Sequence, residues 1–261
     1  MNNIQQKINE IQTNGYNLDF SEVFNAALEN YKKIALNAGL ALLLFSIVLG
    51  IFGASIVGGI FGFSSFSSTL TNFNLLNFSV SGIFGYLLLV VLIAAITAPF
   101  NAGIIKMAFL ADENQEFSLA NAFDYYKGNY FKELFLAALL VALITVSLNM
   151  LLEYTNTFLV GKLLTYVISF FTLLINPLII FGNLKAVDAI KASFMIVSKQ
   201  IPVLLALVIV AIIVSCLGII GFCIGVFFTI PFIFSVYFMI YKQIFGVATV
   251  SEIEEIGTFQ E

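Results

Sequence analysis

The sequence predicts an all-α integral membrane protein, a polytopic bundle of six transmembrane helices with three short amphipathic helices on its cytoplasmic side. Of the 261 residues, 61% are hydrophobic and 10% are charged, and the mean hydropathy is +1.04. A soluble domain carries about 25% charged and roughly 45–50% apolar residues, so a soluble core cannot absorb this excess. Six stretches are long and apolar enough to cross a bilayer, and almost all lysines fall on one side of them.

The six stretches are justified by length, because a spanning helix needs about 20 mostly apolar residues. They cover approximately residues 34–61, 83–110, 134–152, 163–181, 202–217 and 221–245. The last two are joined only by LGIIGFCIG, so a single re-entrant unit is the alternative there. The chain accordingly divides into a polar N-terminal tail (1–18), a single six-span membrane domain (19–248) and an acidic C-terminal tail (249–261).

The lysines orient these spans. The side that holds both termini carries ten lysines, and the other side carries only Lys162. The ten are Lys7, Lys32, Lys33, Lys106, Lys127, Lys132, Lys185, Lys191, Lys199 and Lys242. Loops rich in lysine stay in the cytoplasm, so both termini are expected there. Lysine in place of every arginine, with abundant Asn, Ile and Phe, is typical of an AT-rich bacterial genome, which predicts the inner (plasma) membrane of a bacterium.

An amphipathic stretch precedes each pair of spans, at residues 20–34, 118–132 and 185–197. All three follow helical spacing. The third is expected to place its apolar face on Val187, Ile190, Phe194 and Val197. The second span of each pair contains one proline, at Pro99, Pro177 and Pro231. The pattern predicts a threefold repeat of amphipathic helix, span and proline-containing span. The alternative is that polytopic proteins in general carry interfacial helices on the cytoplasmic side.

The absence of three residue types narrows the chemistry, because the chain has no His, no Arg and no Trp. Without His there is no Ser–His nucleophile pair and no His-ligated zinc, iron or haem. The net charge of −4 offers no basic face for nucleic acid. We therefore expect no enzymatic activity, no cofactor and no nucleic-acid partner.

The deepest polar residues of the spans are neutral and lie close to the three prolines. A proline frees a carbonyl one turn earlier, and an adjacent Asn can satisfy it or offer its amide to a cavity. The candidate cavity or hinge residues are Pro99, Asn101, Asn176, Pro177, Pro231 and Tyr237. The alternative is that the prolines kink helices for packing while the Asn side chains bridge neighbouring helices.

A second candidate surface lies on the third amphipathic stretch. Asp188 and Lys191 stand one helical turn apart and are candidates for docking a protein partner. The alternative is a solvated pair worth a few tenths of a kcal/mol.

Two runs of residues carry a resemblance to a known group. One is Ala98-Pro99 and Gly103 followed by FSLANAFDYYKGNYFKELF, and the other is NLKAVDAIKASFMIVSKQ followed by a span, a Gly-rich turn, Ile230-Pro231, Tyr237 and Tyr241. Together they resemble a broad group of bacterial six-span integral membrane proteins of unassigned function. This group includes the membrane domain found fused to some glycerophosphodiester phosphodiesterases. The resemblance implies the architecture, and no hydrolase activity is carried over, because the tail SEIEEIGTFQE is too short to hold a phosphodiesterase domain.

These features favour the first of two functions, and the second is the alternative. The first is a non-enzymatic scaffold, assembly or envelope-maintenance factor, with the lipid bilayer and a cytoplasmic or membrane protein as partners. The second is a carrier for a neutral or lipid-like solute that uses the proline-containing spans.

Overall fold

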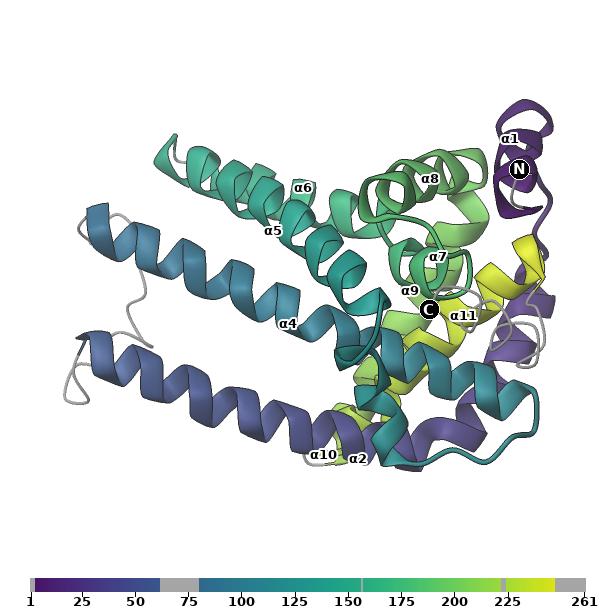
Figure 1. Cartoon of the computed structure of the whole chain (residues 1–261), viewed down its shortest axis with the longest axis horizontal. Coiled ribbons are helices and arrows are strands. Elements are labelled where there is room, and N and C mark those ends of the chain that lie inside the picture. The colour runs from purple at the N-terminus through teal and green to yellow at the C-terminus, as the bar shows by residue number, and fades with distance from the viewer. Residues whose placement is uncertain (1–2, 62–79, 156, 222–223, 247–261) are drawn as a thin grey trace.

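The computed structural model of the chain describes residues 3–61, 80–155, 157–221 and 224–246. These residues form helices and short connections, and no strand occurs within the described ranges. In chain order the helices are α1 (Asn3–Asn14), α2 (Phe20–Phe61), α4 (Val80–Asp112), the 3₁₀-helix η2 (Leu119–Tyr126), α5 (Tyr130–Tyr154), α6 (Phe158–Phe171), α7 (Ile175–Ile180), α8 (Ala186–Lys199), α9 (Ile201–Leu217), the 3₁₀-helix η3 (Gly218–Gly221), α10 (Ile224–Thr229) and α11 (Pro231–Phe245). In Figure 1, α2, α4, α5 and α6 extend in one direction as long rods, while α1, α7, α8 and α11 gather at the opposite end.

The sequence predicted six spans, and five to six stretches of the structure are long and apolar enough to cross a membrane. Five stretches qualify by length and composition: Phe20–Ile56, Phe84–Asp112, Tyr130–Tyr154, Leu159–Ile180 and Ile224–Phe245. The remaining apolar helix, α9, has 17 residues and is bent by 102° from α8. Over the described ranges the protein is therefore all-helical, and its long apolar helices fit a membrane-embedded protein with five candidate spans, or up to six when α8 and α9 count as one bent span.

Large apolar side chains remain exposed along the extended parts of these helices. Among them are Leu44, Ile51, Phe84, Leu88, Ile144 and Leu163. In water, leaving apolar surface exposed forfeits about 25 cal/mol per Å². Lipid tails are as apolar as these side chains, so the same surface carries no such penalty in a bilayer. This exposure fits a lipid-facing surface.

The packed core lies at the end of the molecule opposite to the extended helices. Buried polar contacts join three helices there. Asn30 of α2 donates its amide to the carbonyl of Ala108 in α4 at 2.7 Å and accepts the Ser235 hydroxyl of α11 at 2.9 Å. Around this link, Phe109, Phe181 and Phe238 pack ring against ring. Three helices are thus fixed to one another at this end of the molecule.

The first two amphipathic stretches differ from their prediction. Residues 20–34 form no separate helix, because α2 runs without interruption from Phe20 to Phe61. The second stretch is a 3₁₀-helix, η2, because it is short and lies directly on α4, where Gly103 faces the Ala122 backbone.

The third stretch is a separate helix, α8, and only part of its expected apolar face is buried, at Val197. Val187 and Phe194 are exposed, while the small residues Ala189 and Ser193 are fully buried. Small side chains let α8 approach its neighbours closely, which the larger residues of the expected apolar stripe would prevent.

The N-terminal segment is also more ordered than the expected tail. Residues Asn3–Asn14 form α1, and its Ile8 and Ile11 are buried. The Lys7 ammonium donates to the carbonyl of Phe245 at 2.8 Å, and Lys199 of α8 donates to the carbonyl of Gln12 at 2.8 Å. The helices nearest to the two termini therefore meet at one end of the bundle. The expected acidic tail, 249–261, lies outside the described residues.

Candidate functional site

A break in the fourth apolar stretch positions the first part of the site. Pro177 has no N–H to donate to the carbonyl one turn earlier, and the helix is interrupted between Phe171, the end of α6, and Ile175, the start of α7. Ser193 of α8 bridges this interruption by donating to the carbonyl of Phe171 at 2.7 Å and accepting the N–H of Leu174 at 3.3 Å. Ser193 was not among the residues predicted from the sequence, although a serine flanked by the apolar residues of an amphipathic helix was a detectable signal.

The other two prolines behave differently from each other. Pro231 opens α11 directly after α10 ends at Thr229, so the helix is interrupted at Ile230 within the stretch Ile224–Phe245. Pro99, in contrast, is buried inside α4, which continues from Val80 to Asp112. Pro99 therefore does not interrupt its helix, because a proline can be accommodated within a helix when its neighbours pack around it.

A cavity of about 540 Å³ lies among five of these helices and opens to the surroundings of the protein. Its wall is formed by Val90, Ala94, Thr97, Ala98 and Asn101 of α4, Ala137, Ala138, Val141, Ala142, Thr145 and Val146 of α5, Ser169 of α6, Thr172 and Leu173 of the break, Ile175 and Asn176 of α7, and Phe234 and Tyr237 of α11. Three of the six candidate residues, Asn101, Asn176 and Tyr237, are thus brought together. Pro99, Pro177 and Pro231 are not part of the wall, but each lies within a few residues of it.

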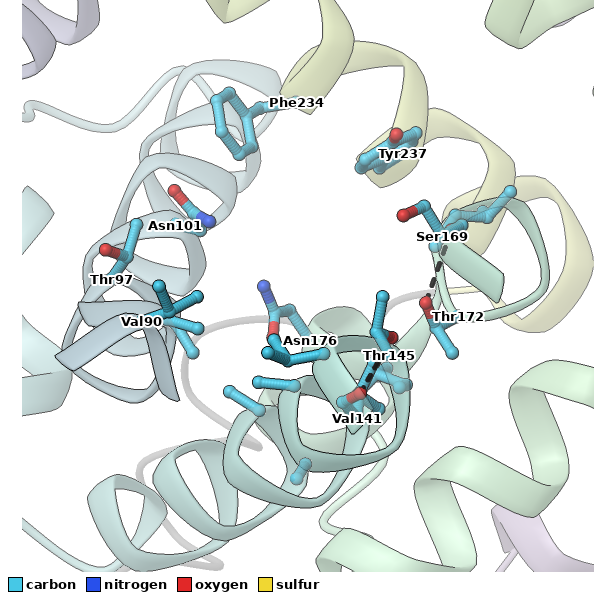
Figure 2. Close-up of a pocket in the computed structure, with 18 residues that line it drawn as sticks. Val90, Thr97, Asn101, Val141, Thr145, Ser169, Thr172, Asn176, Phe234 and Tyr237 are labelled. Atoms are coloured by element: carbon cyan, nitrogen blue, oxygen red, sulfur yellow. Dashed lines mark hydrogen bonds between the residues drawn. The ribbon is translucent and has the colours of Figure 1, made fainter. Parts of the chain in front are cut away.

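The two asparagines present free amide groups to this space. Figure 2 shows the side chains of Asn101 and Asn176 directed into the cavity from different helices, with Tyr237 on another side of it. Neither amide, nor the Tyr237 hydroxyl, makes a hydrogen bond to another residue in the part of the chain that the structure describes, and no side-chain polar atom there is both buried and unpartnered. These groups therefore remain open to whatever fills the cavity.

The threonines of the wall are satisfied within their own helices. The Thr97 hydroxyl donates to Ile93 at 2.7 Å, and the Thr145 hydroxyl donates to Val141 at 2.8 Å. The Thr172 hydroxyl likewise donates to Ile168 at 2.8 Å. These three hydroxyls add weak polarity to the wall, whereas the asparagines supply both free donors and free acceptors.

The cavity lies at the middle of the apolar stretches. Ala98, Ala142 and Phe234 are at or next to the central residues of Phe84–Asp112, Tyr130–Tyr154 and Ile224–Phe245, and all three line it. Its wall contains no Lys, Asp or Glu. The cavity is therefore an uncharged, mostly apolar space in the centre of the membrane-spanning region, with a few hydrogen-bonding groups.

Two charged side chains of the helices that form the wall, Lys106 and Glu133, have partners of their own. Lys106 of α4 forms an ion pair with Asp124 of η2 at 2.8 Å, and its ammonium lies 5.7 Å from the centre of the Tyr125 ring. Glu133 accepts the N–H of Ala186 at 2.8 Å, which places a carboxylate at the N-terminus of α8, where it is favourable. These side chains join α4 to η2 and α5 to α8, and neither of them lines the cavity.

The candidate docking residues do not line this cavity. Asp188 and Lys191 are exposed on α8 and line a smaller groove of about 320 Å³, which they share with Gln5, Asn9 and Gln12 of α1. They form no ion pair with each other. The face predicted to dock a partner is thus flanked by the protein's own N-terminal helix.

Comparison with known proteins finds no family model, no curated protein and no solved structure that matches this chain. The resemblance to the six-span group therefore stays a prediction.

Proposed function

We propose that the protein is a membrane carrier that binds a neutral or lipid-like solute in the cavity between α4, α5, α6, α7 and α11. The observation that carries this proposal is the meeting of Asn101 and Asn176 in an uncharged space at the middle of the spans. Broken spans around a midplane site are a recurrent design among transporters, and α6–α7 and α10–α11 supply two of them here.

Energetics supports an occupant. An amide that is removed from water without a hydrogen-bond partner costs about 1–3 kcal/mol by mutational data. A sequence that placed leucine at Asn101 and Asn176 would avoid that cost in a bilayer. Both amides are left free by the protein itself in a space that opens to its surroundings, so a solute that enters from the membrane can satisfy them.

The test compares the lipids and small solutes that remain bound after purification in a mild detergent, identified and counted by mass spectrometry. The wild-type chain is expected to retain an uncharged species, and the double variant Asn101→Leu with Asn176→Leu is expected to lose it while unfolding at the same or higher denaturant concentration. A double variant that retains as much of the species as the wild type would overturn the proposal.

Asn149→Leu is the matched control. This asparagine is also in a span, but it does not line the cavity and donates to the carbonyl of Thr145 and the hydroxyl of Thr165. Its loss is expected to lower stability and leave the bound species in place, the opposite of the double variant.

We also propose six spans in a bacterial inner membrane, with both termini in the cytoplasm. The meeting of α1 with the end of α11, and the lysines that gather there, support this orientation. Fusions of a fluorescent protein and of alkaline phosphatase to each terminus test it, because the first folds in the cytoplasm and the second is active only outside it. Active phosphatase at either terminus would refute the orientation.

A scaffold role is the second candidate, supported by the exposed polar groove between α1 and α8. Charge reversal of Asp188 and Lys191, followed by crosslinking and co-purification, tests this role. A set of crosslinked proteins that does not change upon charge reversal would count against it.

A further inference from the structure

The hydrogen-bonding groups of the cavity restrict which solute can satisfy them. Each carboxamide, at Asn101 and at Asn176, offers two N–H donors and one acceptor oxygen, and the Tyr237 hydroxyl can donate or accept. A ligand that only accepts, such as a simple ester, leaves the amide oxygens without a partner. A ligand that both donates and accepts satisfies both sides of each amide.

The charge of the wall restricts the solute further. None of the residues that line the cavity is Lys, Asp or Glu, and Lys106, on the same helix as Asn101, is held by Asp124 at 2.8 Å. An anionic head group would be buried there without a counter-ion, which is strongly unfavourable in a membrane interior. Carboxylate and phosphate heads are therefore disfavoured.

The size and position of the cavity also restrict the part of the solute that lies beyond its polar head group. A volume of about 540 Å³ lies within the range of small-molecule sites, roughly 300–1,000 Å³. The space is open rather than enclosed, and it lies at the depth of the apolar stretches. A head group can occupy the polar part while an attached hydrocarbon chain extends through the opening into the bilayer.

We infer that the solute is an uncharged single-chain lipid with a hydroxyl-bearing head group, of which a monoacylglycerol is the simplest example. Its hydroxyls donate to the Asn101 and Asn176 oxygens and accept from their N–H groups, and its chain lies along the Val90 and Val141 side of the wall. This inference rests on the proposed function, because it specifies the occupant of the same cavity.

The experiment uses the full chain in lipid nanodiscs and a monoacylglycerol with a photoactivatable diazirine in its acyl chain. Crosslinked peptides are located by mass spectrometry, and unlabelled competitors are then titrated. The competitors are 1-monooleoylglycerol, methyl oleate, which only accepts hydrogen bonds, oleate, which is anionic, and dioleoyl phosphatidylglycerol, which carries hydroxyls on an anionic head.

The expected result is crosslinking to α4, α5 or α6 peptides and displacement by 1-monooleoylglycerol at about tenfold lower concentration than by methyl oleate, as the loss of one hydrogen bond implies. The two anions are expected to be weaker competitors as well, because the cavity holds no counter-ion for their charge. In the double variant Asn101→Leu with Asn176→Leu this preference is expected to disappear, and in Asn149→Leu it is expected to persist. Equal displacement by methyl oleate, stronger displacement by either anion, or a preference that survives in the double variant would overturn the inference. Crosslinking to the cavity without this preference leaves the proposed carrier function standing, whereas the absence of any crosslink to these helices refutes both.

Discussion

Gly103 is the position where one added methyl group tests the packing of η2 on α4 most directly. A Cβ atom at this position would lie 2.2 Å from the carbonyl oxygen of Ala122, 2.5 Å from its carbonyl carbon and 2.7 Å from its Cα, whereas ordinary contact begins at 3.4 Å. All three are backbone atoms, so no change of rotamer relieves the overlap. In Gly103→Ala, η2 has to move away from α4 by about 1 Å.

The cost follows from the contacts that this movement disturbs. The Tyr126 hydroxyl of η2 donates to the carbonyl of Ile96 at 2.6 Å, and Asp124 pairs with Lys106 at 2.8 Å. A displacement of that size takes both contacts beyond the usual hydrogen-bond length of about 3.2 Å. Overpacking costs about 1–3 kcal/mol, while alanine in place of glycine in a helix returns about 0.5–1 kcal/mol. We expect Gly103→Ala to lower the free energy of unfolding by about 1–2 kcal/mol.

Titration of sodium dodecyl sulfate into detergent-solubilised protein, followed by circular dichroism, measures this difference. Gly85→Ala is the matched control on the same helix, because a Cβ there meets nothing within 4 Å. The control is expected to be as stable as the wild type or up to about 1 kcal/mol more stable. If Gly103→Ala instead unfolds together with Gly85→Ala, the close packing of η2 on α4 is refuted.

Three further predictions can be checked by the same titration. Ser193→Ala leaves a carbonyl and an N–H at the α6–α7 break without their partner and should lower the free energy of unfolding by about 1–3 kcal/mol. Ser198→Ala, at an exposed position of the same helix, should lower it by less than about 0.5 kcal/mol. Equal unfolding midpoints of the two variants would contradict this. Asn30→Ala should lower the free energy of unfolding by about 1–3 kcal/mol. The double variant with Ser235→Ala should lose less stability than the two single variants together, because the two side chains share a hydrogen bond. Additive losses would show that this hydrogen bond contributes nothing. Burial raises the pKa of Tyr126 from 10.0 to about 12, so the neutral form is favoured in the folded state. The stability that this contributes is complete below pH 10 and is lost as the pH rises towards 12. Tyr126→Phe should lose less stability over that interval than the wild type, and an identical loss would disprove the assignment.

The asparagines show how far the sequence can be taken towards the site. Asn101, Asn149 and Asn176 all fall within apolar stretches, and only Asn101 and Asn176 lie close to a proline, which is the one local signal that separates them. In the folded protein the Asn149 amide donates a hydrogen bond to the Thr165 hydroxyl at 2.7 Å, whereas Asn101 and Asn176 face the cavity. Helical periodicity places a residue on one face of its own helix, but the partner on that face belongs to a helix elsewhere in the chain.

The effect of a proline on its helix also depends on the neighbouring helices. Pro177 interrupts its span and Pro99 does not, although each lacks the same N–H. At Pro177 the interruption is stabilised by Ser193, which α8 brings to it from a later part of the chain. Sequence identifies where a helix can break, and the neighbouring helices decide whether it does.

The sequence by itself determined that the chain is helical, that it belongs in a membrane and that its charges lie away from the spans, because these properties follow from composition and the transfer of side chains between water and lipid. The tertiary structure alone decided that α1 packs onto α8, that η2 lies against Gly103, and that two amides from distant parts of the chain share one cavity. Such contacts depend on the shapes of surfaces that meet only after folding, where a single methyl group or hydroxyl selects one arrangement over another.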